Sequence, residues 1–275
     1  MTTVSDTRSF WKRGGAGTAY DAEFKDIVGW YVNESELRPF ADLFRERRGA
    51  KVLDVGCGTG RHLALFHPSN ELFGLDLSSE MLACAAERVP QAKFLAASAD
   101  TLPFENDTFD IVLSVRVLQH IQDQEKFVEE MVRVCKPGGQ VALLSYNSWS
   151  LLCLYKQIRM SRIGRVLNIP FKLILGRRSF FNPWGFTYDN YCSAPEISGW
   201  MRAAGVSPEK IWGVTLGQAW FWNDFFIGKV LQRTAPAALK LLMRIFLWMD
   251  HALARHWPLK YFSEKVVWVG SKKNP

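Results

Sequence analysis

The chain has 275 residues, of which 48% are apolar and 22% are charged, and its net charge is +7. This is the composition of an ordinary globular protein, and it excludes disordered, collagen-like and disulfide-scaffold proteins. The five cysteines lie far apart without a C-x-x-C pair, so we expect a reducing compartment and no bound metal. The N-terminal segment has no apolar core, and no apolar run reaches about 18 residues. We therefore expect neither a signal peptide nor a membrane-spanning helix, and a cytoplasmic location.

The first predicted element is an amphipathic helix near the N-terminus. Its apolar face is formed by Leu37, Phe40, Leu43 and Phe44, which recur at helical spacing. We expect residues 1–48 to form a helical cover over the edge of the sheet that follows in the sequence.

A parallel sheet is predicted between residues 51 and 147, where short β-branched runs alternate with longer helical patterns. Ser78 and Asp123 are expected to cap the helices that follow them, and Pro137-Gly138-Gly139 is expected to end the second of these helices. The predicted strands are residues 51–55, 71–76, 92–97, 109–115 and 140–146.

The regular alternation ends after residue 148. A short helix closed by Gly205 is predicted at residues 195–205, and two further strands are predicted at 210–215 and 265–273. The sequence therefore predicts an N-terminal helical cover at residues 1–48, a core at 49–147 and the remainder of the sheet at 148–275. Within the last part, we expect two aromatic-rich lid insertions, at residues 148–208 and 216–262.

The strongest motif is VLDVGCGTGR at residues 52–61, a buried strand followed by three alternate glycines and then a predicted helix. Gly56, Gly58 and Gly60 remove side chains where the backbone turns sharply, so a ligand can lie against main-chain N–H groups at a helix start. Asp76 ends the next strand, where a carboxylate can accept hydrogen bonds from ribose hydroxyls. Together these features indicate an adenosine-type ligand.

The chain resembles the class I S-adenosylmethionine-dependent methyltransferases of the UbiE-like subgroup, also called methyltransferase type 11. The resemblance covers roughly residues 50–147, in the blocks VLDVGCGTG, GLDLSSEML, TLPFENDTFDIVLSVRVLQHI and VRVCKPGGQVALL. It implies an α/β, doubly wound, Rossmann-like sheet of seven mostly parallel strands in the order 3-2-1-4-5-7-6, with the last strand antiparallel. It also implies S-adenosylmethionine as cofactor and S-adenosylhomocysteine as product. The G-x-G-x-G spacing favours this family over nicotinamide-binding Rossmann enzymes.

The resemblance implies a position for each part of the cofactor. Asp54 and the glycine loop would face the methionine end, with Cys57 as a small spacer, and Asp76 would hold both ribose hydroxyls. Where the family often has an acid for the adenine amino group this chain has Ser98, so either Ser98 or Asp100 would make that contact. The implied cofactor-binding residues are Asp54, Gly56, Cys57, Gly58, Gly60, Asp76, Leu77, Met81, Ser98, Ala99, Asp100, Ser114 and Val115.

Two residues are candidates for catalysis. His120 follows the fourth strand at the mouth of the expected cleft, where it is either a general base or polar wall of the acceptor site, or a histidine that fixes its loop by hydrogen bonding. Tyr20 lies in a stretch that can fold over the cleft, either for gating and acceptor contact or for simple packing.

The charge is distributed unevenly along the chain. Residues 1–150 hold 16 Lys and Arg against 21 Asp and Glu, whereas residues 151–275 hold 18 against 6, together with eight of the eleven tryptophans. This asymmetry predicts that the second half meets an anionic, aromatic or apolar partner.

Two apolar segments of the second half carry basic residues at intervals. In residues 237–257, Lys240, Arg244, His251 and Arg255 form a thin basic stripe, and residues 148–180 combine aliphatic residues with arginines in a similar way. A helix of this kind either packs in a lid or lies on a membrane surface, so a peripheral membrane contact is the alternative to a lid.

These features predict an enzyme that methylates a small, largely apolar acceptor, such as a quinone, polyketide, lipid or lipid-linked glycan, including one that bears phosphate. One alternative is an RNA methyltransferase, supported by the basic second half, although its basic residues are interleaved with aliphatic ones instead of forming a polar groove. The other alternative is a cofactor-binding assembly factor that does not catalyse.

Overall fold

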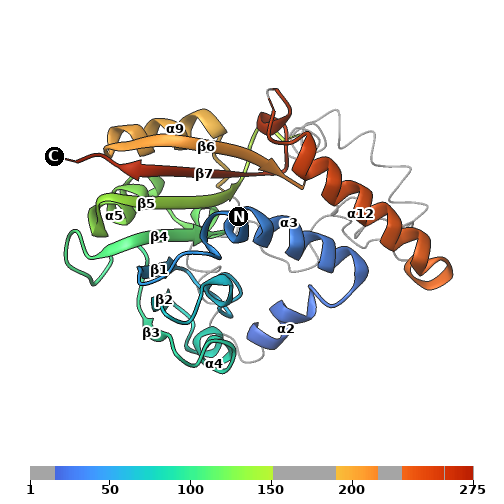
Figure 1. The fold of residues 1–275 in the computed structure, drawn as a ribbon, viewed down its shortest axis with the longest axis horizontal. Helices are drawn as coiled ribbons and strands as arrows, with labels where there is room; N and C mark the ends of the chain where they lie inside the picture. The colour runs from blue at the N-terminus through green and yellow to red at the C-terminus, as the bar shows by residue number, and fades with distance from the viewer. Residues whose placement is uncertain (1–15, 151–189, 216–230, 257, 275) are drawn as a thin grey trace.

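The structure is a computed structural model that describes residues 16–150, 190–215, 231–256 and 258–274. Seven strands form one sheet in the order β3-β2-β1-β4-β5-β7-β6 (Figure 1). Neighbours among β1 to β5 are parallel, whereas β7 is antiparallel to both β5 and β6, which confirms the predicted order and the antiparallel last strand. The strands are β1 (Lys51–Val55), β2 (Glu71–Asp76), β3 (Lys93–Ala96), β4 (Phe109–Val115), β5 (Cys135–Tyr146), β6 (Val206–Val214) and β7 (Lys265–Lys272).

Helices cover both faces of this sheet, as the doubly wound fold requires (Figure 1). The side chains of each strand alternate between the two faces, so Leu53 packs with Phe127 on one side while Val52 packs with Phe40 on the other. The helices are α2 (Ala16–Ala22), α3 (Ile27–Phe44), α4 (Ser79–Arg88), α5 (Gln124–Val134), α9 (Ala194–Ala203) and α12 (Pro236–Ala252), with the short 3-10 helices η1 (Leu63–Leu65), η2 (Leu118–His120) and η3 (Leu259–Tyr261).

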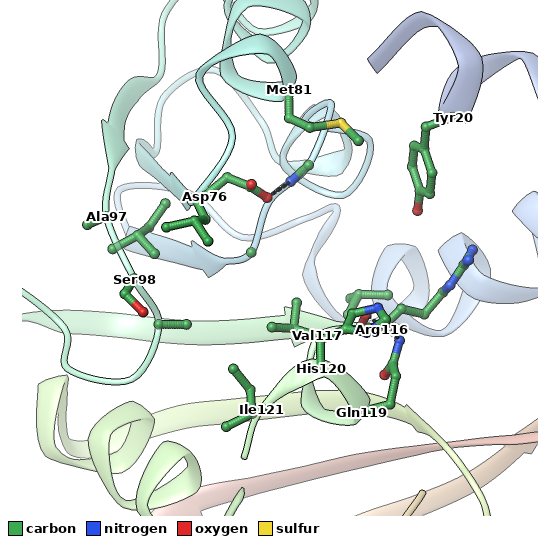
Figure 2. Close-up of a pocket in the computed structure, with 16 residues that line it drawn as sticks. Tyr20, Asp76, Met81, Ala97, Ser98, Arg116, Val117, Gln119, His120 and Ile121 are labelled. Atoms are coloured by element: carbon green, nitrogen blue, oxygen red, sulfur yellow. Dashed lines mark hydrogen bonds between the residues drawn. The ribbon is translucent and has the colours of Figure 1, made fainter. Parts of the chain in front are cut away.

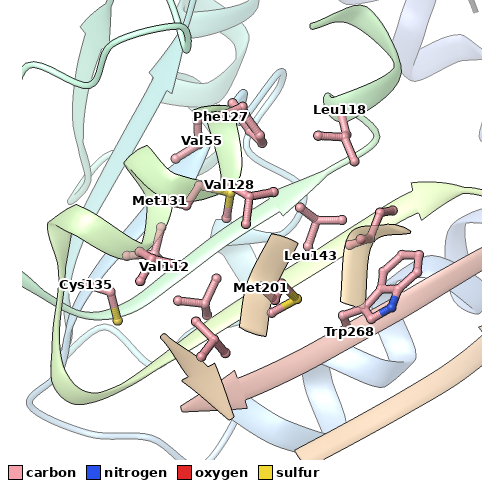
Figure 3. Packing of buried hydrophobic residues seen from close by; sticks show 14 of the residues in the cluster. Val55, Val112, Leu118, Phe127, Val128, Met131, Cys135, Leu143, Met201 and Trp268 are labelled. Carbon is pink, nitrogen blue, oxygen red and sulfur yellow. The ribbon is translucent and has the colours of Figure 1, made fainter. Parts of the chain in front are cut away.

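The larger core lies between the sheet and the helices α5 and α9. Phe127 and Met131 of α5, Met201 of α9 and Trp268 of β7 belong to this core, and all four side chains are almost completely buried (Figure 3). The Trp268 indole donates a hydrogen bond to the Ser198 hydroxyl of α9, so its one polar group is satisfied. The core also includes Leu118 and Ile121, which lie on either side of His120 in the segment after β4.

Side-chain caps begin the helices where the sequence predicts them. The Ser78 hydroxyl accepts from the Met81 amide at the start of α4, and the Asp123 carboxylate accepts from the Lys126 amide at the start of α5. Each cap satisfies a backbone donor that the first helical turn leaves unpaired. The cap at Ser78 also fixes α4 directly behind Asp76, the last residue of β2.

Two predictions about the first half need correction. The helix expected after the glycine loop is only η1, because the short stretch before β2 is ended by Pro68 and by a turn in which the Asn70 side chain donates to the His67 carbonyl. The helix expected at the sheet edge, α3, instead covers a face, where Phe40 and Phe44 pack over the central strands β1, β4, β5 and β7.

Two strands also begin earlier than predicted. β5 starts at Cys135, directly after α5, and the Pro137-Gly138-Gly139 segment forms an irregularity that shifts its register against β4. β6 starts at Val206 and has a register shift beside Pro208, at the edge of the sheet, where a residue without an N–H group is tolerated. In both cases a proline lies near the start of the strand, and because proline disfavours strands the sequence predicted a later start.

The helix α12 packs along α3, where Leu239 and Met243 meet Val28 and Tyr31 in a third cluster. Lys240, Arg244 and His251 of the predicted basic stripe are exposed, next to the exposed apolar residues Leu241, Ile245 and Trp248. Among the described helices, none has the length and apolar character needed to cross a bilayer. Most of the predicted insertion at 148–208, including the basic segment up to residue 180, and the aromatic part of the insertion at 216–262 lie outside the described residues.

Candidate active site

A pocket opens at the carboxyl ends of β1, β2 and β4, the edge at which open α/β sheets bind ligands (Figure 2). Ten of the fifteen predicted site residues line it, namely Tyr20, Gly56, Gly58, Asp76, Leu77, Met81, Ser98, Ala99, Val115 and His120. Leu75, Ala97, Arg116, Val117, Gln119 and Ile121 complete the lining. The other five predicted residues, Asp54, Cys57, Gly60, Asp100 and Ser114, do not line the pocket.

The glycine loop shapes the pocket, but its N–H groups are already bonded. The Gly56 and Cys57 amides both donate to the Leu75 carbonyl, and the Gly58 amide donates to the Asp76 carboxylate. In this structure these amides therefore bond within the chain itself. Glycine is needed for space and conformation, since Gly56 has φ +73° and a Cβ there would lie 2.2 Å from the Val117 side chain. A Cβ on Gly58, by contrast, would meet nothing within 4 Å and would project into open space.

Asp76 lies at the centre of one end of the pocket. Its carboxylate accepts hydrogen bonds from the Gly58 and Ser78 amides, both at 2.9 Å, so it ties the loop after β1 to the loop after β2. Burial raises the pKa of this carboxyl, whereas the two backbone hydrogen bonds lower it. Each oxygen still has acceptor capacity for a ligand hydroxyl, because a carboxylate oxygen can accept more than one hydrogen bond.

Asp54 is a buried carboxyl group without a partner. It is 1% exposed, and neither carboxylate oxygen has a hydrogen-bond partner within the described structure. Burial and the nearby charge of Asp76 raise the pKa of Asp54 to about 8. Unpaired buried acids of this kind are rare, and an ammonium or sulfonium group is the chemical partner that would satisfy one.

Ser98 lines the pocket at the same end as Asp76, and Asp100 lies behind it. The Ser98 hydroxyl donates to the Asp100 carboxylate at 2.8 Å and accepts from the Asp100 amide at 3.4 Å, which leaves one lone pair of its oxygen as an acceptor. Of the two residues left open by the sequence, only Ser98 lines the pocket.

The remaining three predicted residues support the site from behind. Cys57 packs against Gly74, where any Cβ would lie 2.8 Å from the sulfur, and burial raises the pKa of the thiol well above its usual value. The Ser114 hydroxyl donates to the Val55 carbonyl and joins β4 to β1. Gly60 lies against Ala85 of α4, and a Cβ added to Gly60 would lie 3.1 Å from the Ala85 Cβ.

The opposite end of the pocket is polar and aromatic. Figure 2 shows Tyr20, Arg116 and Gln119 on the side away from Asp76, Ala97 and Ser98. The Gln119 side-chain nitrogen donates to the Arg116 carbonyl at 2.6 Å and lies 3.2 Å from His120 Nε2, which fixes the orientation of the imidazole. The Tyr20 hydroxyl, from α2, accepts from Arg61 at 3.1 Å.

A buried ionic cluster lies beneath this end and was not predicted. The Glu36 side chain of α3 is fully buried, and its carboxylate contacts Arg61 at 3.2 Å, Lys265 at 3.2 Å and Arg116 at 3.4 Å. Burial alone would raise the pKa of Glu36, but these three cations hold it well below its usual value. The helical spacing of Glu36 and Phe40 was the available signal, because it puts the acid on the apolar face. Among the described residues, no cluster of His, Cys, Asp and Glu could hold a metal ion.

Comparison with known proteins places the similarity in the sheet core. Residues 53–143 match a family model described as a methyltransferase domain. A phosphatidylethanolamine N-methyltransferase of Cereibacter sphaeroides is 37% identical over 139 residues, covering 46% of this chain and 68% of the relative. A ubiquinone/menaquinone biosynthesis C-methyltransferase of Pasteurella multocida is 32% identical over 44% of this chain, and the match spans about half of that relative, 49%.

Solved structures show the same fold over most of the chain. A methyltransferase of Thermotoga maritima matches with a TM-score of 0.61 at 18% identity, covering 96% of this chain and 99% of that one. A phosphoethanolamine N-methyltransferase of Haemonchus contortus, in complex with S-adenosyl-L-methionine, matches with a TM-score of 0.60 at 20% identity, covering 100% of this chain and 61% of that one.

Proposed function

Because the chain belongs to the methyltransferase-domain family of S-adenosylmethionine-dependent methyltransferases, we propose that it methylates a small, largely apolar acceptor in this pocket. The observation that carries the proposal is that one pocket joins the Asp76 end, suited to a nucleoside, to a polar end formed by Tyr20, Arg116 and His120. Donor and acceptor can therefore meet within one pocket.

The chain's own residues would hold the cofactor along the pocket. Asp76 would accept hydrogen bonds from the ribose hydroxyls, and Leu77 and Met81 would pack beside the adenine. The Ser98 oxygen would accept a hydrogen bond from the adenine amino group. Asp54 does not line the pocket, but its buried carboxyl, unpaired within the described structure, lies in β1 two residues before the pocket-lining Gly56 and would neutralise the ammonium group of the methionine part. S-adenosylmethionine, when bound, supplies an electrophilic methyl group on a sulfonium.

The acceptor end aligns the nucleophile and excludes water. Methyl transfer is an in-line displacement with a good leaving group, so alignment is the main contribution of the protein. Val115 and Val117 form the apolar wall between the two ends of the pocket. His120 accepts the proton of the acceptor on a ring nitrogen where the acceptor is acidic, and Gln119 orients the ring.

The chemical class of the acceptor is inferred from the relatives and from the ion pairs that basic residues of the second half make within the chain. The relatives named above are a phosphatidylethanolamine and a quinone methyltransferase, which are named for largely apolar substrates. Several cations of the basic second half have acidic partners inside this chain: Arg255 pairs with Asp42, Lys272 with Asp107 and Lys265 with Glu36. Such pairing weakens the case for RNA, which needs cations free to contact phosphates.

Replacing Asp76 by alanine should weaken S-adenosylhomocysteine binding by about 1–3 kcal/mol. The variant loses charge-assisted hydrogen bonds to the ribose and the link between the Gly58 and Ser78 amides. Calorimetric titration of the full chain measures this loss. Glu71→Gln is the matched control, since Glu71 begins the same strand at its far, exposed end, and its affinity should equal that of the wild type. Unchanged affinity of Asp76→Ala would contradict the proposed site.

Cofactor binding at pH 7 should release up to about one proton from Asp54. The pKa of Asp54 is about 8 in the folded, ligand-free chain, against an ordinary 3.8. Between these two pH values the folded chain holds a proton that the unfolded chain has lost, so the stability of the fold falls as the pH rises from about 3.8 to about 8. An ammonium group favours the ionised form and expels that proton. Titrations in buffers of different ionisation enthalpy count the protons released, and Asp54→Asn should release none. A wild-type heat independent of buffer would argue against the contact.

The acceptor class can be tested with a radiolabelled methyl donor. We expect label to pass from S-adenosylmethionine to the lipid or small-molecule fraction of a cell extract and not to RNA. Labelling of RNA alone would establish the alternative acceptor. Tight cofactor binding without transfer to any fraction would indicate an assembly factor.

A further inference from the structure

Arg116 has a backbone conformation that few long side chains adopt. Its φ is +60°, in the left-handed region, directly after β4 ends at Val115. The conformation is fixed from both sides, because the Arg116 amide donates to the Leu144 carbonyl and the Arg116 carbonyl accepts from the Gln119 side chain. Backbone strain of this kind persists where the surrounding structure imposes it, and it concentrates at functional sites.

The strained backbone brings the guanidinium of Arg116 to the polar end of the pocket (Figure 2). There it lies beside two aromatic rings, 5.6 Å from the ring centre of Tyr20 and 5.8 Å from that of Tyr146. Its only ion pair within the described structure is with Glu36 at 3.4 Å, and its buried Nε has no hydrogen-bond partner there. The guanidinium therefore retains N–H donors that make no hydrogen bond within the described structure, and its planar shape presents them as a fork.

The neighbouring charges do not neutralise Arg116 fully. Arg61 and Lys265 each approach the Glu36 carboxylate more closely, at 3.2 Å, than Arg116 does. Glu264 contacts Lys265 at 3.8 Å, whereas Glu23, another acid near Arg116, makes no ion pair with it within the described structure. Of the three cations that contact Glu36, Arg116 is therefore the one that lines the pocket and has the longest contact with the carboxylate.

We propose that Arg116 binds an anionic group of the acceptor, a carboxylate or a phosphate, and so selects acceptors that carry one. This inference rests on the proposed function and names the acceptor class for the same pocket. An arginine fork beside aromatic rings suits a bidentate oxyanion attached to an apolar body. Because Arg116 and Asp76 lie at opposite ends, an anion held at Arg116 leaves the rest of the acceptor to extend past Val117 toward the methyl donor.

The test measures binding of three small probes to the full chain, with and without S-adenosylhomocysteine. The probes are phenyl phosphate, benzoate and the neutral benzyl alcohol, and their binding is followed by calorimetry. We expect at least one anion to bind about tenfold more tightly than benzyl alcohol, since a hydrogen-bonded charge pair contributes at least that much. Phenyl phosphate alone would indicate a phosphate-bearing acceptor, and benzoate alone a carboxylate.

Arg116→Gln should remove this preference, and Arg116→Lys should retain only part of it, because lysine keeps the charge without the fork. Glu36 keeps Arg61 and Lys265 in both variants, so we expect both to fold. Arg48→Gln removes an exposed arginine that pairs with Glu46 and should bind like the wild type. Equal binding of all three probes to the wild type, or an anion preference that survives in Arg116→Gln, would overturn the inference. Since S-adenosylhomocysteine binding is measured separately, its loss would instead count against the proposed function.

Discussion

Replacing Glu36 by glutamine should lower the free energy of unfolding by about 3–5 kcal/mol, because it removes the one acid that neutralises several buried cations. Arg61, Arg116 and Lys265 come from the glycine-loop segment, the end of β4 and the start of β7, and they converge on this single carboxylate. Glutamine preserves the shape but removes the charge that the three cations share in a low-dielectric interior, where Glu264 still contacts Lys265. Urea denaturation at pH 7 measures the loss.

The pH dependence of stability gives an independent readout of the same cluster. The pKa of Glu36 is below its ordinary value of 4.5 in the folded chain, so the stability that it contributes is complete above about pH 4.5 and is lost as the pH falls further. The wild type should therefore lose stability more steeply on acidification than Glu36→Gln. Glu46→Gln is the control, since its ion pair with Arg48 is exposed, and it should cost at most about 1 kcal/mol. A similarly small cost for Glu36→Gln would show that the cluster is not a stabilising element.

The sheet could be predicted from the sequence because its signals are local. Each parallel strand contains a short run of mainly apolar residues, and helix caps such as Ser78 satisfy backbone donors only three residues away. The glycine loop and Asp76 are also short-range signals, because neighbouring parallel strands bring their carboxyl ends to one edge. Hence the sequence pattern predicted most of the residues that line the Asp76 end of the pocket, although it did not predict the internal hydrogen bonds of the loop amides.

The acceptor end could not be predicted in the same way, because it is assembled from distant parts of the chain. Glu36 and Lys265 meet only after β7 inserts between β5 and β6, and no local pattern pairs them. Arg116 lies within a recognised block, but its left-handed backbone follows from hydrogen bonds to Leu144 and Gln119. The position of α3 over a face follows likewise from the packing of Phe40 and Phe44 on strands distant in the sequence, whereas the apolar spacing within α3 does not show which part of the sheet it covers.

The second large effect is expected at His120, where asparagine should lower the rate of methyl transfer by about 10²–10⁴-fold while S-adenosylhomocysteine affinity stays unchanged. The side chain lines the pocket at the acceptor end, and Gln119 orients its ring, as a proton acceptor requires. Asparagine keeps polarity and hydrogen-bonding capacity but cannot take up a proton at neutral pH. Transfer of label to the most active extract fraction measures the rate, and calorimetry measures the affinity.

A purely structural His120 would behave differently in the same variants. Loss of a loop-fixing hydrogen bond would lower the free energy of unfolding by about 1–2 kcal/mol and disturb cofactor binding along with the rate. His67→Asn is the matched control, because His67 is exposed and contacts only Ser69 among the described side chains, so rate and affinity should both be retained. A His120→Asn variant with wild-type turnover would remove proton transfer from the mechanism and leave alignment by Arg116 and Tyr20 as the main contribution of this end of the pocket.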